Sequence, residues 1–149
     1  MKLQFKTQEY QTQATKRVID IFKGQEKGNR VDIIERKILD DGVFGKKTQE
    51  IKRFSNKEIS LSNEELLKNI QDTQKQDELL KISQNFKAGF NFSIEMETGT
   101  GKTFVYTKTM FELHKNYGWN KFIIVVPSIA IREGVHKSLD ITSDYFKEI

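Results

Sequence analysis

Two glycines set between an alternating apolar segment and a helical segment constrain this chain more than any other feature. Residues 96–103 read Met-Glu-Thr-Gly-Thr-Gly-Lys-Thr. Apolar and polar residues alternate over 90–96, which predicts a β-strand, and the pattern over 102–117 predicts a helix. Because Gly99 and Gly101 have no Cβ, they can take backbone conformations that are closed to other residues. We therefore expect a tight loop that joins a strand to a helix.

The loop has the composition of a phosphate-binding loop. Its end matches the pattern G-x-x-x-x-G-K-[ST], although Met96 stands where the pattern has its first glycine. Backbone amides of such a loop, and of the helix that follows, can surround phosphate oxygens. Lys102 would reach the β- and γ-phosphates of ATP, and the Thr103 hydroxyl would hold Mg²⁺. The alternative is a plain glycine turn that caps a helix. The predicted nucleotide contacts within the loop, with Lys102 as the catalytic residue, are Thr98, Gly99, Thr100, Gly101, Lys102 and Thr103.

The segments after the loop predict an α/β class. Phe-Ile-Ile-Val-Val at 122–126 is a continuous apolar run, as in strands buried within parallel sheets, and Pro127 ends it. Apolar residues at four-residue spacing then predict a helix through Ile131 and Leu139. Strand, loop, helix, strand and helix together predict an incomplete RecA-like P-loop NTPase domain over 89–149, with a parallel sheet flanked by helices.

Two further zones precede this domain. Residues 1–24 predict a helix from about Gln8 to Lys23, with Thr7 as its N-cap and an apolar stripe that includes Tyr10. Residues 25–88 read as an irregular, partly helical connector or insertion. Within it, Val31 to Leu39 suits either a strand or a short helix, and Ser62 with Glu65 predicts a capping box at the start of a helix.

Composition narrows the function classes. The net charge is +4 and the pI is about 9.2, which suits a protein that meets polyanions. The chain has no cysteine and only two histidines, so thiolate and histidine metal sites are not expected. No apolar run is long enough for a signal peptide or a membrane span. A cytoplasmic protein without membrane contact is expected.

Three motifs together resemble superfamily 2 helicases and translocases. An apolar residue at Met96 ahead of T-G-T-G-K-T resembles their motif I. V-V-P-S-I-A-I-R-E-G at 125–134 is similar to motif Ia, which implies that Ser128 and Arg132 contact the DNA backbone; alternatively, Ser128 only caps a helix. Gln11 after Tyr10 resembles the adenine-reading Q motif, because a carboxamide offers both a donor and an acceptor; alternatively, Gln11 is a surface residue.

The stretch 94–135, with M-E-T-G-T-G-K-T, F-E-L, Y-G, K-F-I-I-V-V-P-S and A-I-R-E-G, resembles the Res subunit of type III restriction enzymes. That resemblance implies ATP-dependent translocation on double-stranded DNA, an endonuclease domain elsewhere in Res, and a Mod methyltransferase partner that uses S-adenosylmethionine. The chain lacks a D-E-x-H-like box, so we expect an amino-terminal segment that is inactive alone. The alternatives are a fragment of another superfamily 2 helicase, or an inactive remnant.

Overall fold

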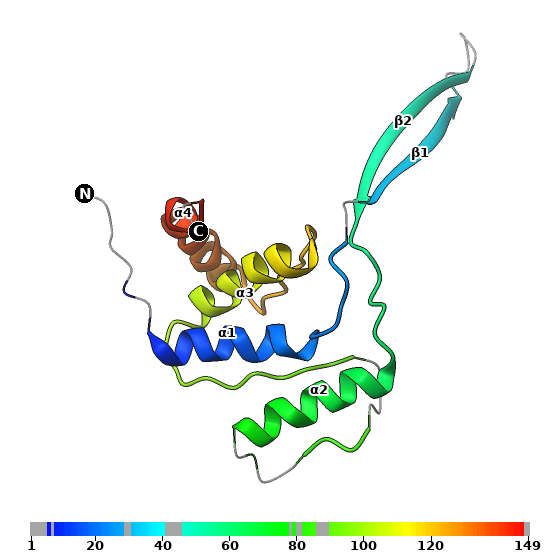
Figure 1. Ribbon diagram of the computed structural model, residues 1–149. Helices are drawn as coiled ribbons and strands as arrows, with labels where there is room; N and C mark the ends of the chain where they lie inside the picture. Colours follow the sequence, from blue (N-terminus) through cyan, green and yellow to red (C-terminus); the bar gives the residue numbers. More distant parts are fainter. Residues whose placement is uncertain are drawn as a thin grey trace.

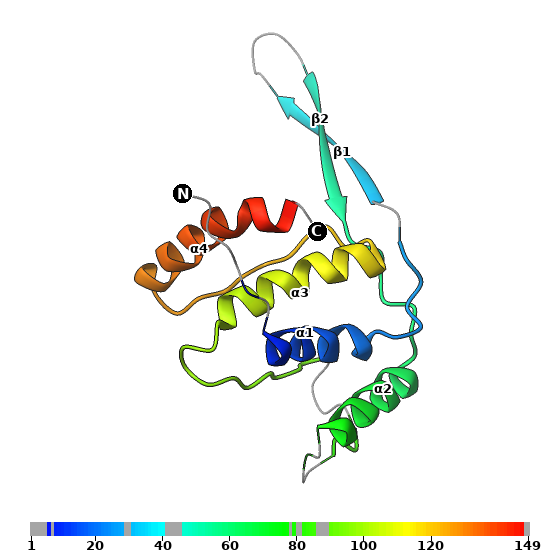
Figure 2. The same cartoon turned by 60° about the vertical axis from the view of Figure 1, so that its left-hand side comes forward.

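The computed structural model describes residues 6, 8–28, 31–40, 46–77, 79, 82–85 and 90–147. In these ranges the chain forms helices and one hairpin of strands (Figure 1). In chain order they are α1 (Glu9–Ile21), β1 (Val31–Asp40), β2 (Lys46–Ser55), α2 (Asn63–Gln76), α3 (Lys102–Tyr117) and α4 (Ile129–Lys147). The hairpin projects away from the helices in both views (Figures 1 and 2).

The expected parallel sheet is not present among the described residues, so the predicted α/β class and RecA-like fold are wrong. β1 and β2 pair antiparallel, with Val31 opposite Ser55, and residues 90–96 and 121–126 belong to no β-ladder. An extended segment becomes a strand only when a neighbour about 4.8 Å away exchanges backbone hydrogen bonds with it. The alternation of apolar and polar side chains indicates an extended backbone, but it does not show whether a second strand lies beside it. The second segment instead leads from the end of α3 to α4 (Figure 2).

Helix α1 begins one residue later than the sequence suggested. Its N-cap is Gln8, which has extended backbone angles and makes no side-chain capping hydrogen bond, and Thr7 lies outside the described residues. The helix ends at Ile21, and Gly24 follows with φ of 97°. The helix itself is confirmed, but its predicted apolar stripe is only partly buried, since Tyr10 is exposed.

One hydrophobic core joins α1, α2 and α3. Trp119 is buried edge-on to Phe22, with ring centroids 4.9 Å apart. The Tyr117 hydroxyl donates to the Ile19 carbonyl at 2.9 Å, and burial, followed by the nearby Asp20 charge, raises the Tyr117 pKa. All three sequence zones therefore contribute to the same core. Its buried members are Ile21, Phe22, Leu66, Ile70, Leu113, Tyr117 and Trp119.

The capping box of α2 is confirmed. The Ser62 backbone N–H donates to Glu65 Oε2 at 2.8 Å, and the Glu65 N–H donates to Ser62 Oγ at 3.3 Å. These hydrogen bonds favour the ionised carboxylate and lower the Glu65 pKa below its usual value of 4.5. Two backbone donors at the start of α2 are thereby satisfied by side chains.

Helix α3 is held at its carboxyl end by a close approach of backbone. Gly118 has φ of 73°, and a Cβ built on it would lie 2.0 Å from the Gly28 carbonyl oxygen. The Gly28 N–H in turn donates to the Tyr117 carbonyl at 3.0 Å. The segment that leaves α1 towards the hairpin is therefore joined to the end of α3.

Helix α4 packs its carboxyl-terminal half on α3, where Phe146 is stacked on Phe111 with centroids 4.8 Å apart. The helix that the sequence predicted after Pro127 is confirmed, although Ile131 on its apolar stripe is exposed. Among the helices described, none is long and apolar enough to cross a lipid bilayer.

Candidate functional site

The glycine loop is a tight turn that leads directly into α3. Gly99 and Gly101 both have φ of 83°, in the left-handed region that favours glycine. The Thr100 hydroxyl donates to the Glu97 carbonyl at 2.6 Å and closes the turn. Gly101 is the N-cap of α3, and its carbonyl accepts the first helical hydrogen bond from Val105 at 3.0 Å. The predicted change from loop to helix at Lys102 is confirmed.

The start of α3 has no side-chain cap. Gly101, as the N-cap, has no side chain that could accept a hydrogen bond, and the first turn contains no acidic residue. The backbone amides of a helix start need acceptors, and the helix dipole makes this end positive. An uncapped start beside two left-handed glycines is suited to binding an anion through backbone amides.

The ammonium group of Lys102 lies back over the loop. Its Nζ donates to the Met96 carbonyl at 2.6 Å and to the Glu97 carbonyl at 3.1 Å. A backbone carbonyl is available from any residue type. Met96 can therefore make this contact through its carbonyl, just as a glycine at that position of the usual pattern could.

Two residues of α1 reach the loop from the opposite end of the sequence. The Tyr10 hydroxyl and Gln11 Nε2 both donate to the Thr100 carbonyl, each at 3.0 Å. Gln11 is only 9% exposed, so the structure does not place it as a surface residue. Its adenine-reading role stays a prediction, because this hydrogen bond goes to loop backbone. Sequence reasoning placed Tyr10 in an apolar stripe and before the glutamine of a Q-motif-like pair, and did not predict its contact with the loop. The polar end of the phenol, next to Gln11, was the signal for that contact.

The other predicted nucleotide ligands lie on the loop and in the first turn of α3. Thr98 is exposed, and Thr103 is partly buried in the first turn of α3, where its carbonyl accepts from the Thr107 hydroxyl at 2.8 Å. The Mg²⁺ contact of Thr103 stays a prediction. Within the described ranges, no three histidine, cysteine or acidic side chains gather as a metal-ligand cluster.

The predicted DNA-backbone residues lie at the start of α4 and make local contacts. Ser128 Oγ accepts a hydrogen bond from the Ile131 N–H at 3.3 Å, which is the helix-capping contact that the sequence allowed as an alternative. Arg132 is exposed and pairs with Glu133 at 2.9 Å. Contact of Ser128 and Arg132 with DNA stays a prediction.

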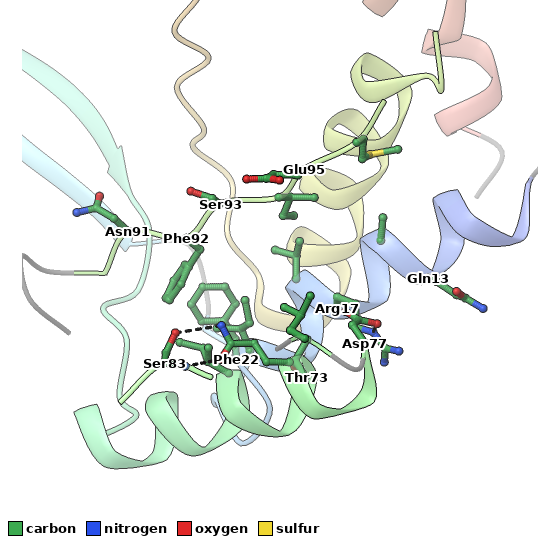
Figure 3. Close-up of a pocket in the computed structure, with 18 of the residues that line it drawn as sticks. Gln13, Arg17, Phe22, Thr73, Asp77, Ser83, Asn91, Phe92, Ser93 and Glu95 are labelled. Carbon is green, nitrogen blue, oxygen red and sulfur yellow. Dashed lines mark hydrogen bonds and ion pairs between the residues drawn. The ribbon is translucent and has the colours of Figure 1, made fainter. Parts of the chain in front are cut away.

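A groove of about 1280 Å³ is lined by α1, α2 and the extended segment 91–97, and Thr100 of the loop is among its lining residues. Figure 3 shows Arg17 of α1, Thr73 of α2 and Phe92 of the extended segment around it. Phe22 forms part of its apolar floor. Polar contacts tie its sides together: Arg17 Nε donates to Asp77 Oδ1 at 2.8 Å, and the Ser83 N–H donates to Gln74 Oε1 at 2.8 Å. The groove therefore connects the core with the glycine loop.

Comparison with known proteins assigns the family. The family described as "Type III restriction enzyme, res subunit" matches residues 4–148, which is nearly the whole chain. The chain therefore belongs to the Res subunit family of type III restriction enzymes, and the resemblance carried by residues 94–135 is confirmed.

Individual relatives agree with that assignment. The chain is 41% identical over 99 residues to the type III restriction-modification enzyme EcoPI Res subunit of Escherichia phage P1. It is 39% identical over 99 residues to the EcoP15I Res subunit of Escherichia coli. Each of these alignments covers 66% of this chain and 10% of the relative. The StyLTI Res subunit of Salmonella typhimurium is 49% identical over 67 residues, or 45% of this chain and 7% of the relative. The chain thus spans about a tenth of the length of these relatives.

Proposed function

We propose that this chain is the ATP-binding segment of a Res subunit, and that the complete enzyme couples ATP hydrolysis to movement along double-stranded DNA and to its cleavage. One observation carries the proposal. Two left-handed glycines lead into an uncapped helix start, and the Lys102 ammonium lies beside them. Amides and an ammonium are the donors that a triphosphate requires.

The residues present fit ATP with Mg²⁺. Gly101 has φ of 83°, a conformation that residues with a Cβ rarely adopt, so glycine is favoured at this point of the loop. The loop amides and the start of α3 would hold phosphate oxygens, and Lys102 would exchange its carbonyl partners for the β- and γ-phosphates. The Thr103 hydroxyl would hold Mg²⁺, which supplies charge neutralisation between phosphate oxygens when it is bound. Gln11 would complete the site from α1, where its carboxamide donates to the Thr100 carbonyl.

The partners follow from the same assignment. The relatives' printed names describe Res subunits of type III restriction-modification enzymes. By extension, this protein would act in the cytoplasm with a Mod methyltransferase subunit, which would carry S-adenosylmethionine. Ser128 and Arg132, at the exposed start of α4, would contact the DNA backbone without reading its sequence.

Substitution of Lys102 tests the proposal. In the complete enzyme, Lys102→Ala should abolish ATP hydrolysis and ATP-dependent DNA cleavage, because phosphate charge is no longer neutralised. Assembly with the Mod subunit should persist, since Lys102 is exposed and outside the core. Lys115→Ala, at the exposed far end of α3, is the matched control and should leave both activities unchanged. Normal ATP-dependent cleavage by the Lys102 variant would contradict the proposal.

The 149-residue chain gives a second test. We expect it to bind ATP·Mg²⁺ and not to hydrolyse it, because Thr103 is the one Mg²⁺-directed side chain that the motifs identify. Nucleotide binding by calorimetry and phosphate release with and without DNA would measure both properties. DNA-stimulated turnover that disappears in Lys102→Ala would show that the chain is catalytically sufficient, against this expectation.

A further inference from the structure

Two adjacent residues of α1 donate to one carbonyl of the glycine loop. Tyr10 and Gln11 are separated from Thr100 by 90 and 89 positions, respectively, yet each makes a 3.0 Å hydrogen bond to its carbonyl oxygen. Successive residues of a helix point about 100° apart. A carbonyl that accepts from both must therefore lie over the first turn of α1, between the two side chains.

This contact fixes the direction of a whole peptide group. The Thr100 carbonyl and the Gly101 N–H belong to the same planar trans unit, in which the C=O and N–H bonds point in opposite directions. When the carbonyl is held against α1, the Gly101 N–H must point to the side of the loop that faces away from α1. Without that restraint, the peptide group could rotate, because the rotation changes ψ of Thr100 and φ of Gly101, and Gly101 has few steric limits.

We infer that Tyr10 and Gln11 are positioning residues, which hold the Thr100–Gly101 peptide so that its N–H faces a bound phosphate group. The inference rests on the proposed function and adds a role that the nucleotide-binding motif does not contain. It assigns Gln11 to the phosphate end of the nucleotide. An adenine-reading Gln11 would act at the opposite end, so the two roles differ in what they predict for ligands without adenine.

The variants remove donors and keep side-chain size. Tyr10→Phe removes only the hydroxyl, and Gln11→Met removes the carboxamide from a side chain of similar length. Gln13→Met is the matched control on α1, where Nε2 of the exposed Gln13 donates to Glu9 Oε1 at 3.3 Å. Tyr106→Phe is the control for loss of a phenol hydroxyl, because the Tyr106 hydroxyl has no hydrogen-bond partner within the described part of the chain.

Binding of ATP, GTP and inorganic tripolyphosphate to the 149-residue chain, by calorimetry with Mg²⁺, is the measurement. Each single variant should lower the affinity for all three ligands by the same factor, about threefold to tenfold. This factor corresponds to the loss of one neutral hydrogen bond. The double variant should lose more than the product of the singles, because after either single change the other donor still holds the carbonyl. Both controls should bind like the unmodified chain. Circular dichroism would verify that each variant is folded.

Two outcomes would overturn the inference. If Gln11→Met lowers the affinity for ATP alone and leaves the affinity for tripolyphosphate unchanged, Gln11 reads the base. If the double variant binds all three ligands normally, the Thr100 contact does not set the loop. Failure of the proposed function would give a different result. Either Lys102→Ala would not lower the affinity for tripolyphosphate, or the unmodified chain would not bind tripolyphosphate. In that case ¹⁵N relaxation of Gly99 and Gly101 without ligand still decides: unchanged order parameters in the double variant would refute the positioning role.

Discussion

Helices α2 and α3 begin in opposite ways. At α2, Ser62 and Glu65 satisfy each other's backbone amides in a capping box, and two acidic residues lie in the first turn. At α3, the N-cap is a left-handed glycine without a side chain, and the first turn contains Lys102 and no acidic residue. The first arrangement stabilises the helix by satisfying its own donors, whereas the second leaves donors and positive potential for a ligand. The difference agrees with the proposal that the start of α3 serves binding, whereas the start of α2 stabilises its own helix.

Substitution at Gly101 should have the largest effect. Alanine there would have to adopt φ of 83° and would approach Gln11 Nε2 to 2.7 Å. We expect a loss of about 2 kcal/mol in the free energy of unfolding and loss of ATP binding by more than about tenfold. Chemical denaturation and calorimetry would measure the two quantities.

Gly134→Ala is the matched control for that experiment. Gly134 lies within α4, and a Cβ built on it would meet nothing within 4 Å. It should leave ATP binding unchanged and raise stability by up to about 1 kcal/mol, the difference in helix propensity. Equal effects of the two glycine substitutions on ATP binding would remove the distinction between the start of α3 and an ordinary glycine position.

Ser62→Ala should affect stability alone. It removes the hydroxyl that accepts from the Glu65 N–H, which should cost about 1 kcal/mol in the free energy of unfolding. ATP affinity should not change, because the start of α2 does not contribute to the loop. A change in ATP affinity without a change in stability would reverse the roles assigned to the two helix starts.

The capping box also predicts a small pH dependence. The Glu65 pKa is lower in the folded state than its ordinary value of 4.5, chiefly through its hydrogen bonds to Ser62. Its contribution to stability is therefore complete above the unfolded pKa and is lost as the pH falls through the lower folded pKa. The difference in unfolding free energy between the unmodified chain and Glu65→Gln should shrink in acid. A difference that stays constant down to the lowest pH would contradict this assignment.

Local signals in the sequence predicted the local structure well. The capping box, the start of α3 at Lys102 and its end at Gly118 depend on residues close in sequence. The sheet could not be predicted in this way, because a strand requires a partner at a distance. Ile123 and Val125, from the apolar run that indicated a buried strand, are 82% and 87% exposed.

The residues of the candidate site also differ in whether local sequence signals could predict them. Residues 98–103 form one continuous segment, a loop followed by the first residues of α3, and were found from their spacing. The burial of Gln11 and Thr15 was not predicted, because polar residues on a helix normally face water. Both share a face of α1 with Val18 and Phe22, at spacings of four, three and four residues, and this face is covered by the loop and α3. Periodicity records apolar contacts, and this contact is made by hydrogen bonds.

The projecting hairpin has a consequence for how the site tolerates change in chain length. Gln11 and Thr100 are 89 positions apart, and β1 and β2 lie in the chain between them. The entropy of closing a flexible loop rises only with the logarithm of its length, so even doubling that interval would cost about 0.6 kcal/mol. Insertions or deletions at the far end of the hairpin should therefore leave the Gln11–Thr100 contact intact. The same separation delays its formation during folding, since distant contacts form after local helices.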